Sequence, residues 1–164
     1  MPTVVKQMLY FAFIHSQMAY GIEVYGNTFS SYLNKLIILN NKILRILQNA
    51  PRETHVADLY ITFNTLTLPN LHKFHILLFM HKFFHHNELL PNIFSSYFTK
   101  NSDLHTYNTR SKNEPHFQLF TTSLGQRSIK FKGCQLWCSL PDELRSISST
   151  SVFKTKLKQF LQTL

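Results

Sequence analysis

The sequence predicts a mainly α protein: a helical bundle over residues 1–98, then a basic, irregular, loop-rich region over residues 99–164 that ends in an amphipathic helix. Two segments with helical periodicity, residues 29–48 and 70–87, support this fold class. Hydrophobic residues are 44% and aromatic residues 14% of the 164 residues. This composition is too apolar for a disordered chain and is sufficient for a buried core.

The first expected helix covers residues 4–19, which are apolar on most faces and therefore predict a buried helix. Gly21 and Gly26 end it. The apolar run Met8 to Ile14 is too short and aromatic-rich for a signal peptide and lacks a small-residue cleavage site. No run is long enough to span a bilayer. We expect a soluble, intracellular protein of the nucleus or the cytoplasm, with no membrane partner.

The second expected helix, residues 29–48, has the clearest amphipathic pattern. One half of the helical wheel holds Phe29, Leu33, Leu36, Ile37, Leu39, Ile43, Leu44, Ile46 and Leu47. The other half holds Asn34, Lys35, Asn41, Lys42, Arg45 and Asn49, with Ile38 alone among them. Pro51 lies just beyond the last turn. A face with three cations and no acid fits a phosphate backbone or an ordinary solvated surface, and both interpretations stay open.

Residues 55–64 predict a short helix capped by Thr54, and Pro69 is placed to open the helix over residues 70–87. That helix is apolar nearly all round, which predicts burial on most sides. It also carries His81 and His85, spaced four residues apart as metal ligands can be. No third ligand is evident, so we expect hydrogen-bonded or solvated histidines, no metal and no cofactor.

The polar stretch from residue 99 predicts loops and short extended pieces. Residues 128–132, SIKFK, alternate apolar and cationic side chains and predict a short strand. Asp142 and Glu143 after Pro141 suit the first turn of a helix. The closing helix, residues 151–164, has an apolar seam made of Phe153, Leu157, Phe160, Leu161 and Leu164.

The chain is basic, with 17 Lys and Arg against 8 Asp and Glu and a formal charge of +9. Residues 110–164 hold nine of these cations and three of the acids, a net charge of +6. This balance favours nucleic acid or an anionic membrane as partner, with a mere solubility charge as the alternative, and we favour nucleic acid. The residues expected to contact its backbone are Lys35, Lys42, Arg45, Arg110, Arg127, Lys130 and Lys132.

Catalytic residues are not evident in the sequence. It has three Asp and five Glu, and its only adjacent acids, Asp142 and Glu143, fit a helix start. Two-metal phosphoryl transfer needs carboxylates that converge on two cations, and no plausible set is present. Cys134 and Cys138 predict reduced, buried thiols. The single Trp, Trp137, is either a base-stacking platform or a packing residue, and packing is the commoner role.

Several motifs resemble the C-terminal part of the reverse transcriptase of non-LTR, LINE-type retrotransposons of the jockey-like kind. Tyr20 to Gly26 resembles its YG-x-x-x-WG segment, with Tyr25 where Trp is usual. Further along, the similar segments are the helix Leu33 to Ala50, Leu66 to Pro91 (LPL-x-x-L…HNLLP), His105 to Arg110 (H-x-YNTR), Leu124 to Ser128 (LGQRS), Leu136 to Pro141 (LWNSLP, with Cys138 for Asn) and Phe153 to Leu161 (SFK-x-x-LK-x-x-L). Each motif is weak, but together and in family order they are quite specific.

The resemblance implies the thumb and post-thumb portion of an RNA-directed DNA polymerase, with a thumb-like bundle in residues 1–98. The catalytic palm of that family lies upstream of the YG segment, so we expect a truncated fragment of the transposable element that is not an enzyme on its own. Its expected partners are RNA or DNA backbone, bound without sequence specificity, and the missing palm domain. The alternatives are an all-α protein-interaction module and an inert pseudogene product.

Overall fold

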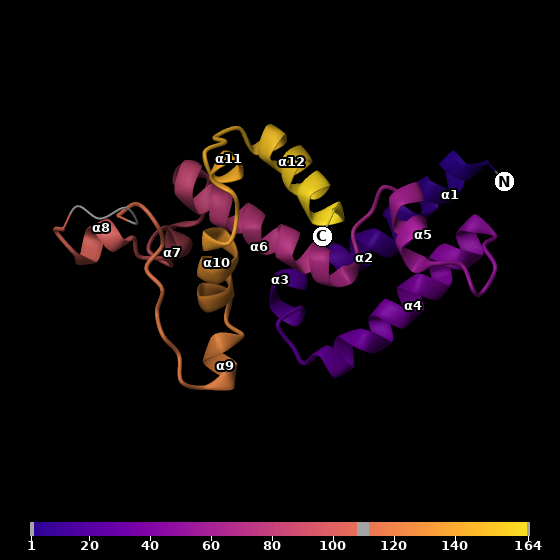
Figure 1. Ribbon diagram of the computed structural model, residues 1–164, viewed down its shortest axis with the longest axis horizontal. Coiled ribbons are helices and arrows are strands. Elements are labelled where there is room, and N and C mark those ends of the chain that lie inside the picture. The colour runs from indigo at the N-terminus through magenta and orange to yellow at the C-terminus, as the bar shows by residue number, and fades with distance from the viewer. Residues whose placement is uncertain (1, 108–111, 164) are drawn as a thin grey trace. The chain divides into compact units, whose positions relative to one another are not determined.

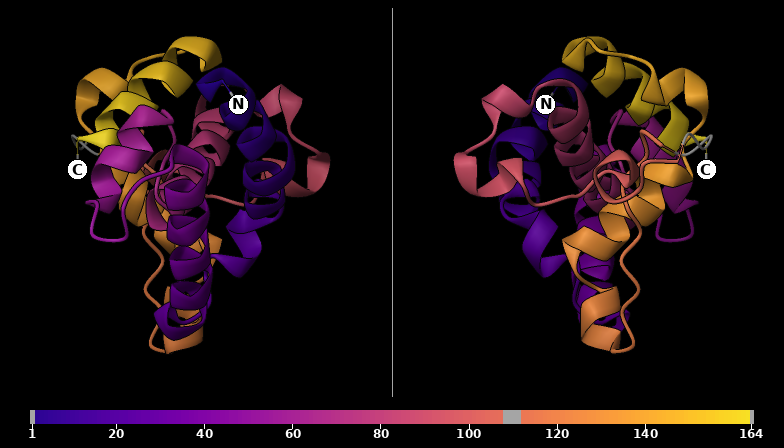
Figure 2. Two further views of the ribbon diagram at one scale, coloured as in Figure 1. Left: turned by 90° about the vertical axis from the view of Figure 1, so that its right-hand side faces the viewer. Right: turned by 90° about the vertical axis from the view of Figure 1, so that its left-hand side faces the viewer.

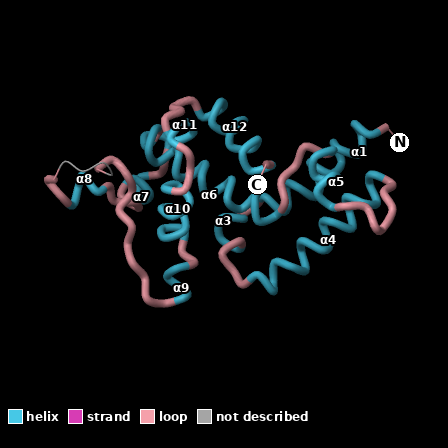
Figure 3. Tube along the Cα trace, in the orientation of Figure 1, coloured by secondary structure: helices cyan, strands magenta, loops and turns pink. Residues whose placement is uncertain are grey.

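The computed structural model describes residues 2–107 and 112–163, and helices dominate them (Figure 3). Over these residues there is no β-strand, only an isolated antiparallel bridge between Lys100 and Pro115. The predicted mainly α fold is therefore confirmed. No helix within the described ranges is long and apolar enough to cross a bilayer.

The chain forms two compact units, residues 1–72 with 161–164, and residues 73–160. The division at residue 98 that the sequence suggests stays a prediction. In the first unit, one helical run comprises α1 (Thr3–Leu9), the π-helical turn η1 (Tyr10–His15) and α2 (Ser16–Ala19). It is followed by α3 (Ile22–Tyr25), the long α4 (Ser30–Gln48), α5 (Val56–Thr62) and the start of α6 (Leu68–His85) (Figures 1 and 2).

The helical run over residues 3–19 is less buried than its composition predicts. Tyr10 and Met18 lie in the core, but Val4, Met8 and Phe13 are exposed. Tyr10 packs edge-on against Phe63, with 5.7 Å between ring centroids. A helix that is apolar all round is buried only where other elements cover it, and here much of its apolar surface stays uncovered. The expectation of a buried helix was thus wrong for much of this segment.

The loop before α5 also differs from the prediction. The residue that precedes the helix is His55, whose side chain makes no capping hydrogen bond, so Thr54 is not the cap. Instead, the Thr54 N–H donates to the carbonyl of Pro51 in a turn, with an N–O distance of 3.1 Å. The following helix, α6, begins at Leu68, and Pro69 is its second residue as expected for a helix start.

The second unit contains the rest of α6 and shorter helices. These are η2 (Asn87–Leu89), α7 (Asn92–Ser95), α8 (Asn101–Leu104), α9 (Ser123–Gln126), α10 (Ile129–Cys138), α11 (Asp142–Arg145) and α12 (Thr150–Gln162). The core is aromatic. Trp137 is 4% exposed and stacks on Phe84, with ring centroids 5.0 Å apart and planes 14° apart. The packing interpretation of Trp137 is confirmed.

The strand expected over residues 128–132 is wrong, because these residues open α10. The Ser128 hydroxyl accepts a hydrogen bond from the Phe131 N–H and caps the helix. Gly133 then allows α6 to approach, since a Cβ at this position would lie 2.9 Å from the sulfur of Met80. Five alternating residues fit a strand, but a cap followed by a buried helical face favours the helix.

Candidate nucleic-acid interface

The candidate site is built on α4 of the first unit and on the loop that follows it. The helix ends at Asn49, which has a left-handed backbone with φ of 52°, and the Ala50 N–H donates to the Arg45 carbonyl at 2.9 Å. Arg45 Nη2 in turn donates to the carbonyl of Thr54 at 3.4 Å. This bond holds the loop over residues 50–55 beside the last turns of the helix.

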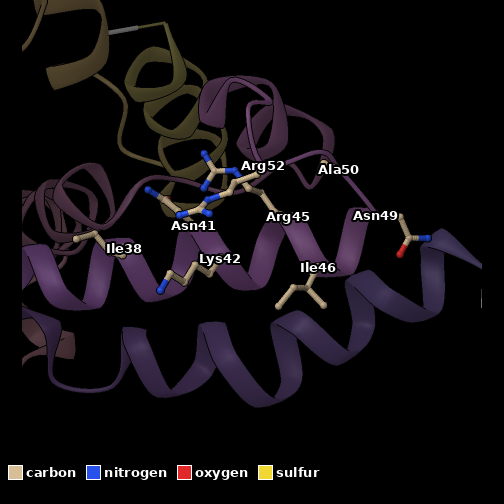
Figure 4. Close-up of a pocket in the computed structure, with 8 residues that line it drawn as sticks. All are labelled: Ile38, Asn41, Lys42, Arg45, Ile46, Asn49, Ala50 and Arg52. Carbon is tan, nitrogen blue, oxygen red and sulfur yellow. The ribbon is translucent and has the colours of Figure 1, made fainter.

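A groove of about 810 Å³ lies along this helix and loop (Figure 4). The residues that line it are Ile38, Asn41, Lys42, Arg45, Ile46, Asn49, Ala50 and Arg52. Three of these eight residues are cations, and none of them is acidic. Because like charges repel, a cluster of this kind is stabilised by an anion that lies between them.

The three cations differ in how they are held. Lys42 and Arg52 are exposed, whereas Arg45 is half-buried. Its Nε is buried and has no hydrogen-bond partner within the described part of the chain. A buried donor without an acceptor costs free energy, which an oxygen of a bound anion would recover. The guanidinium of Arg45 is therefore the best-placed anion ligand of the groove.

The groove also has an apolar component. Ile38 and Ile46 are 54% and 72% exposed, at positions four residues on either side of Lys42. The sequence identifies Ile38 as an apolar residue on the polar face, and the structure places it there. Ile46 was expected on the apolar face, and its exposure corrects that expectation. Both side chains can contact sugar or other uncharged parts of a ligand, but neither can stack on a base as an aromatic ring does.

A chain of hydrogen bonds lies beneath one wall of the groove. The Tyr10 hydroxyl donates to Asn40 Oδ1 at 3.2 Å, and Asn40 Nδ2 donates to the Tyr60 hydroxyl at 2.9 Å. Tyr60 in turn donates to Oδ1 of Asn41, a lining residue, at 2.8 Å. Tyr10, Asn40 and Tyr60 are at most 5% exposed. Burial raises the pKa of Tyr60 to about 12, so its hydroxyl stays protonated at neutral pH.

The predicted site residues on α4 divide into two groups. Lys42 and Arg45 line the groove together. Lys35 is exposed on the same helix but does not line it. Its position seven residues before Lys42 places both on one face of the helix, because seven residues make nearly two full turns. A ligand that extends along α4 can therefore reach Lys35 as well.

Arg127, Lys130 and Lys132 lie in the second unit. Arg127 ends α9, and the two lysines belong to α10. In a strand, Lys130 and Lys132 would share one face, but in a helix residues two apart point about 200° apart. Burial lowers the pKa of Lys132, and the positive charge of Arg127 lowers it further. The helix thus separates the two lysines, and their role in binding stays a prediction.

Arg110 lies outside the described residues. Two residues of the α4 region were missing from the expected site. Arg52 could have been noticed because it directly follows Pro51, where the sequence predicts that the helix has ended. Tyr60 has no signal in the sequence, since its part in the site depends on a contact across 19 residues.

A second concave site, of about 610 Å³, lies in the second unit. It is lined by Asn101, His105, Tyr107, Lys112, Glu114, Pro115, His116, Phe117 and Cys138. Glu114 is not available for chemistry there, because it pairs with Arg145 at 2.7 Å. Burial raises the pKa of the Cys138 thiol, and the charge of Glu114 raises it further, so the thiolate that a nucleophile needs is disfavoured.

No cluster of three or more His, Cys, Asp or Glu side chains suited to a metal ion occurs among the described residues. Cys134 and Cys138 are free thiols, of which Cys134 is buried and Cys138 is exposed. The expectation of reduced thiols is confirmed, and the expected burial holds for Cys134 alone.

In comparisons with protein-family models, with curated proteins and with solved structures, this chain matches none of them.

Proposed function

We propose that this chain binds the backbone of RNA or DNA without sequence specificity, through the groove along α4. The observation that carries the proposal is the set of three cations, Lys42, Arg45 and Arg52, in a groove with no acidic lining residue. Neutralising phosphates releases condensed counterions, which is the main source of non-specific affinity for nucleic acid. The net charge of +9 adds long-range attraction of the same sign.

The lining residues favour contact with the backbone over contact with the bases. None of the eight is aromatic, so the groove offers no platform for base stacking. Its polar side chains can reach phosphate and sugar oxygens, which position a duplex but do not read its sequence. This is the type of contact expected for a polymerase thumb. The motif resemblance to non-LTR retrotransposon reverse transcriptases supports the same origin, and we propose the thumb and post-thumb portion of such a polymerase.

We further propose that this chain is not catalytic by itself. The acids of the chain are few, and two of the eight, Glu114 and Asp142, pair with Arg145. A polymerase site needs carboxylates that hold two metal ions, and the palm that would supply them is not among the motifs that this sequence resembles.

The test is the fluorescence anisotropy of a labelled RNA–DNA hybrid, titrated with the protein at about 50 mM and about 200 mM salt. We expect micromolar or tighter binding that weakens at the higher salt. The variant K42A/R52A removes two exposed groove cations, and we expect it to reduce the slope of log affinity against log salt by about two.

The matched control is K154A/K156A, which removes the same charge from exposed positions on α12. We expect a much smaller loss than for K42A/R52A, because these lysines do not line the groove. No binding by the wild-type protein at low salt, or equal losses in the two double variants, would contradict the proposal.

A second candidate function is protein interaction. The specific observation is the exposed apolar surface of the helical run over residues 3–19, where Val4, Met8 and Phe13 are 59%, 64% and 70% exposed. Exposed apolar surface of this kind often marks a contact with another protein. Light scattering over a range of concentrations tests self-association, and a mass that stays at that of one chain would argue against it.

A further inference from the structure

We propose that Asn41 is a neutral hydrogen-bond donor to the bound backbone and that Tyr60 is the positioning residue that holds it in this role. The inference rests on the proposed function and adds to it a part of the affinity that does not depend on charge. It concerns one wall of the groove, where Asn41 is a lining residue and Tyr60 lies buried behind it.

The direction of the hydrogen bonds follows from the number of donors. A tyrosine hydroxyl has one hydrogen, and an amide has two on nitrogen and none on oxygen. Tyr10 uses its hydrogen on Asn40 Oδ1, which leaves Asn40 Nδ2 to donate to Tyr60. Tyr60 therefore accepts one bond and has its own hydrogen left, and the oxygen of Asn41, 2.8 Å away, accepts it.

This direction decides what Asn41 can offer to a ligand. Its oxygen is engaged by Tyr60, and its Nδ2 has no acceptor among the residues that the structure describes. An isolated asparagine can present either its oxygen or its nitrogen by turning its amide, but here the turned amide would set Nδ2 against the hydrogen of Tyr60. The free capacity of Asn41 is thus two N–H donors.

The polar side chains of the groove then share one property. Lys42, Arg45 and Arg52 are donors without acceptor atoms, and Asn41 joins them as an uncharged donor. The fitting ligand surface is one made only of acceptors, such as the non-bridging oxygens of a phosphodiester. An amide donor to such an oxygen contributes affinity without releasing a counterion, so its contribution does not change with salt.

The experiment uses the anisotropy titration on the full chain, with Tyr60→Phe as the main variant. We expect a loss of affinity of about threefold to tenfold, the size of one hydrogen bond, with an unchanged salt slope. The matched control is Tyr10→Phe, which breaks the same buried chain at its other end but leaves the bond between Tyr60 and Asn41 intact. We expect a lower melting temperature for both variants and wild-type affinity for Tyr10→Phe.

Asn41→Ala provides a second measurement that does not depend on the folding of Tyr60→Phe, since Asn41 is only half-buried and alanine suits a helix. We expect the same loss of affinity as for Tyr60→Phe, and no further loss in the double variant, because both changes remove one contact.

The outcomes separate the two claims. If the wild-type protein does not bind the hybrid, the proposed function fails. If it binds, but Asn41→Ala keeps wild-type affinity or Tyr10→Phe weakens binding as much as Tyr60→Phe, this inference is overturned and the proposed function stands.

Discussion

The imidazole Nε2 of His81 lies 2.7 Å from the carbonyl oxygen of Ile147 and donates its hydrogen to it. Two further histidines of the same region do likewise: His85 donates to the Arg145 carbonyl at 3.0 Å, and His86 donates to the Ser148 carbonyl at 2.7 Å. The three rings thus hold the segment between α11 and α12. Hydrogen bonding is the role expected for His81 and His85 from the sequence, and the structure confirms it.

The first prediction concerns pH. Burial lowers the pKa of His81 below its ordinary value of 6.5, and the neighbouring His85 and His86 lower it further. The unfolded chain therefore takes up this proton at a higher pH than the folded protein does. The stability contributed by neutral His81 is complete above about pH 6.5 and is lost as the pH falls through the folded pKa. We expect a smaller free energy of unfolding at about pH 5 than at about pH 7.5.

Urea unfolding followed by the emission of Trp137, the single Trp of the chain, measures this difference. His81→Phe can keep the stacking on Phe153, whose ring centroid is 4.2 Å away, but it cannot titrate. We expect a less stable protein with a weaker dependence on pH, whereas the exposed control His105→Gln behaves like the wild type. An unchanged pH dependence in His81→Phe would show that another group is responsible.

The second prediction concerns the aromatic core. Trp137→Ala removes the ring that stacks on Phe84 and leaves a cavity, so we expect a loss of about 3–5 kcal/mol in the free energy of unfolding. Trp137→Phe keeps a ring and costs less. Circular dichroism is the measurement, because both variants lack the fluorophore. Tyr20→Ala, at a residue 86% exposed, is the control and should change stability by less than about 0.5 kcal/mol. A loss at Trp137 no larger than that of the control would contradict the packing role.

The third prediction separates two glycines of the YG-x-x-x-WG-like segment. A Cβ on Gly26 would lie 2.5 Å from Cδ2 of His72, so Gly26→Ala forces a shift, and we expect a loss of about 1–3 kcal/mol. Gly21 has open space around it but a φ of 65°. There we expect Gly21→Ala to cost about 1–2 kcal/mol and Gly21→Asn less, since asparagine tolerates the left-handed region. Thermal unfolding compares the three variants, and equal effects of Ala and Asn at Gly21 would exclude backbone strain as the cause.

The fourth prediction concerns the thiols. Burial raises the pKa of Cys134 to about 11, whereas the Cys138 side chain is exposed. Because the thiolate is the reactive form, a disulfide reagent at neutral pH should modify Cys138 quickly and Cys134 only after unfolding. Cys138→Ser should remove the fast phase and leave the slow one. A fast phase that persists in this variant would mean that Cys134 is accessible in the folded protein.

The sequence predicts the positions of the main helices well, because their signals are local. Periodicity, Pro69 and Asp142 place α6 and α11 within a few residues of their observed starts. The strand expected over residues 128–132 failed for a reason that is not local. Its alternation is too short to exclude a helix, and the buried positions of Gly133, Cys134 and Trp137 against other residues of the unit favour the helical form.

The candidate site shows the same division. The cationic face of α4 follows from the spacing of Lys35, Lys42 and Arg45, since 3.6 residues per turn fixes which side chains share a side of the helix. That Arg52 joins this face depends on the turn after Asn49, and the orientation of the Asn41 amide depends on Tyr60, a residue of another helix. Contacts between distant residues leave no periodic pattern in the sequence.

By itself, the sequence determined the fold class, the basic charge and the two faces of α4, all of which follow from local geometry and composition. Tertiary structure decided which apolar side chains are covered. Leu44 is fully buried and Ile46 is 72% exposed, although both belong to the predicted apolar half of the helix. The physical reason is that burial requires a second surface at the right place, and the period of a single helix carries no information about where that surface lies.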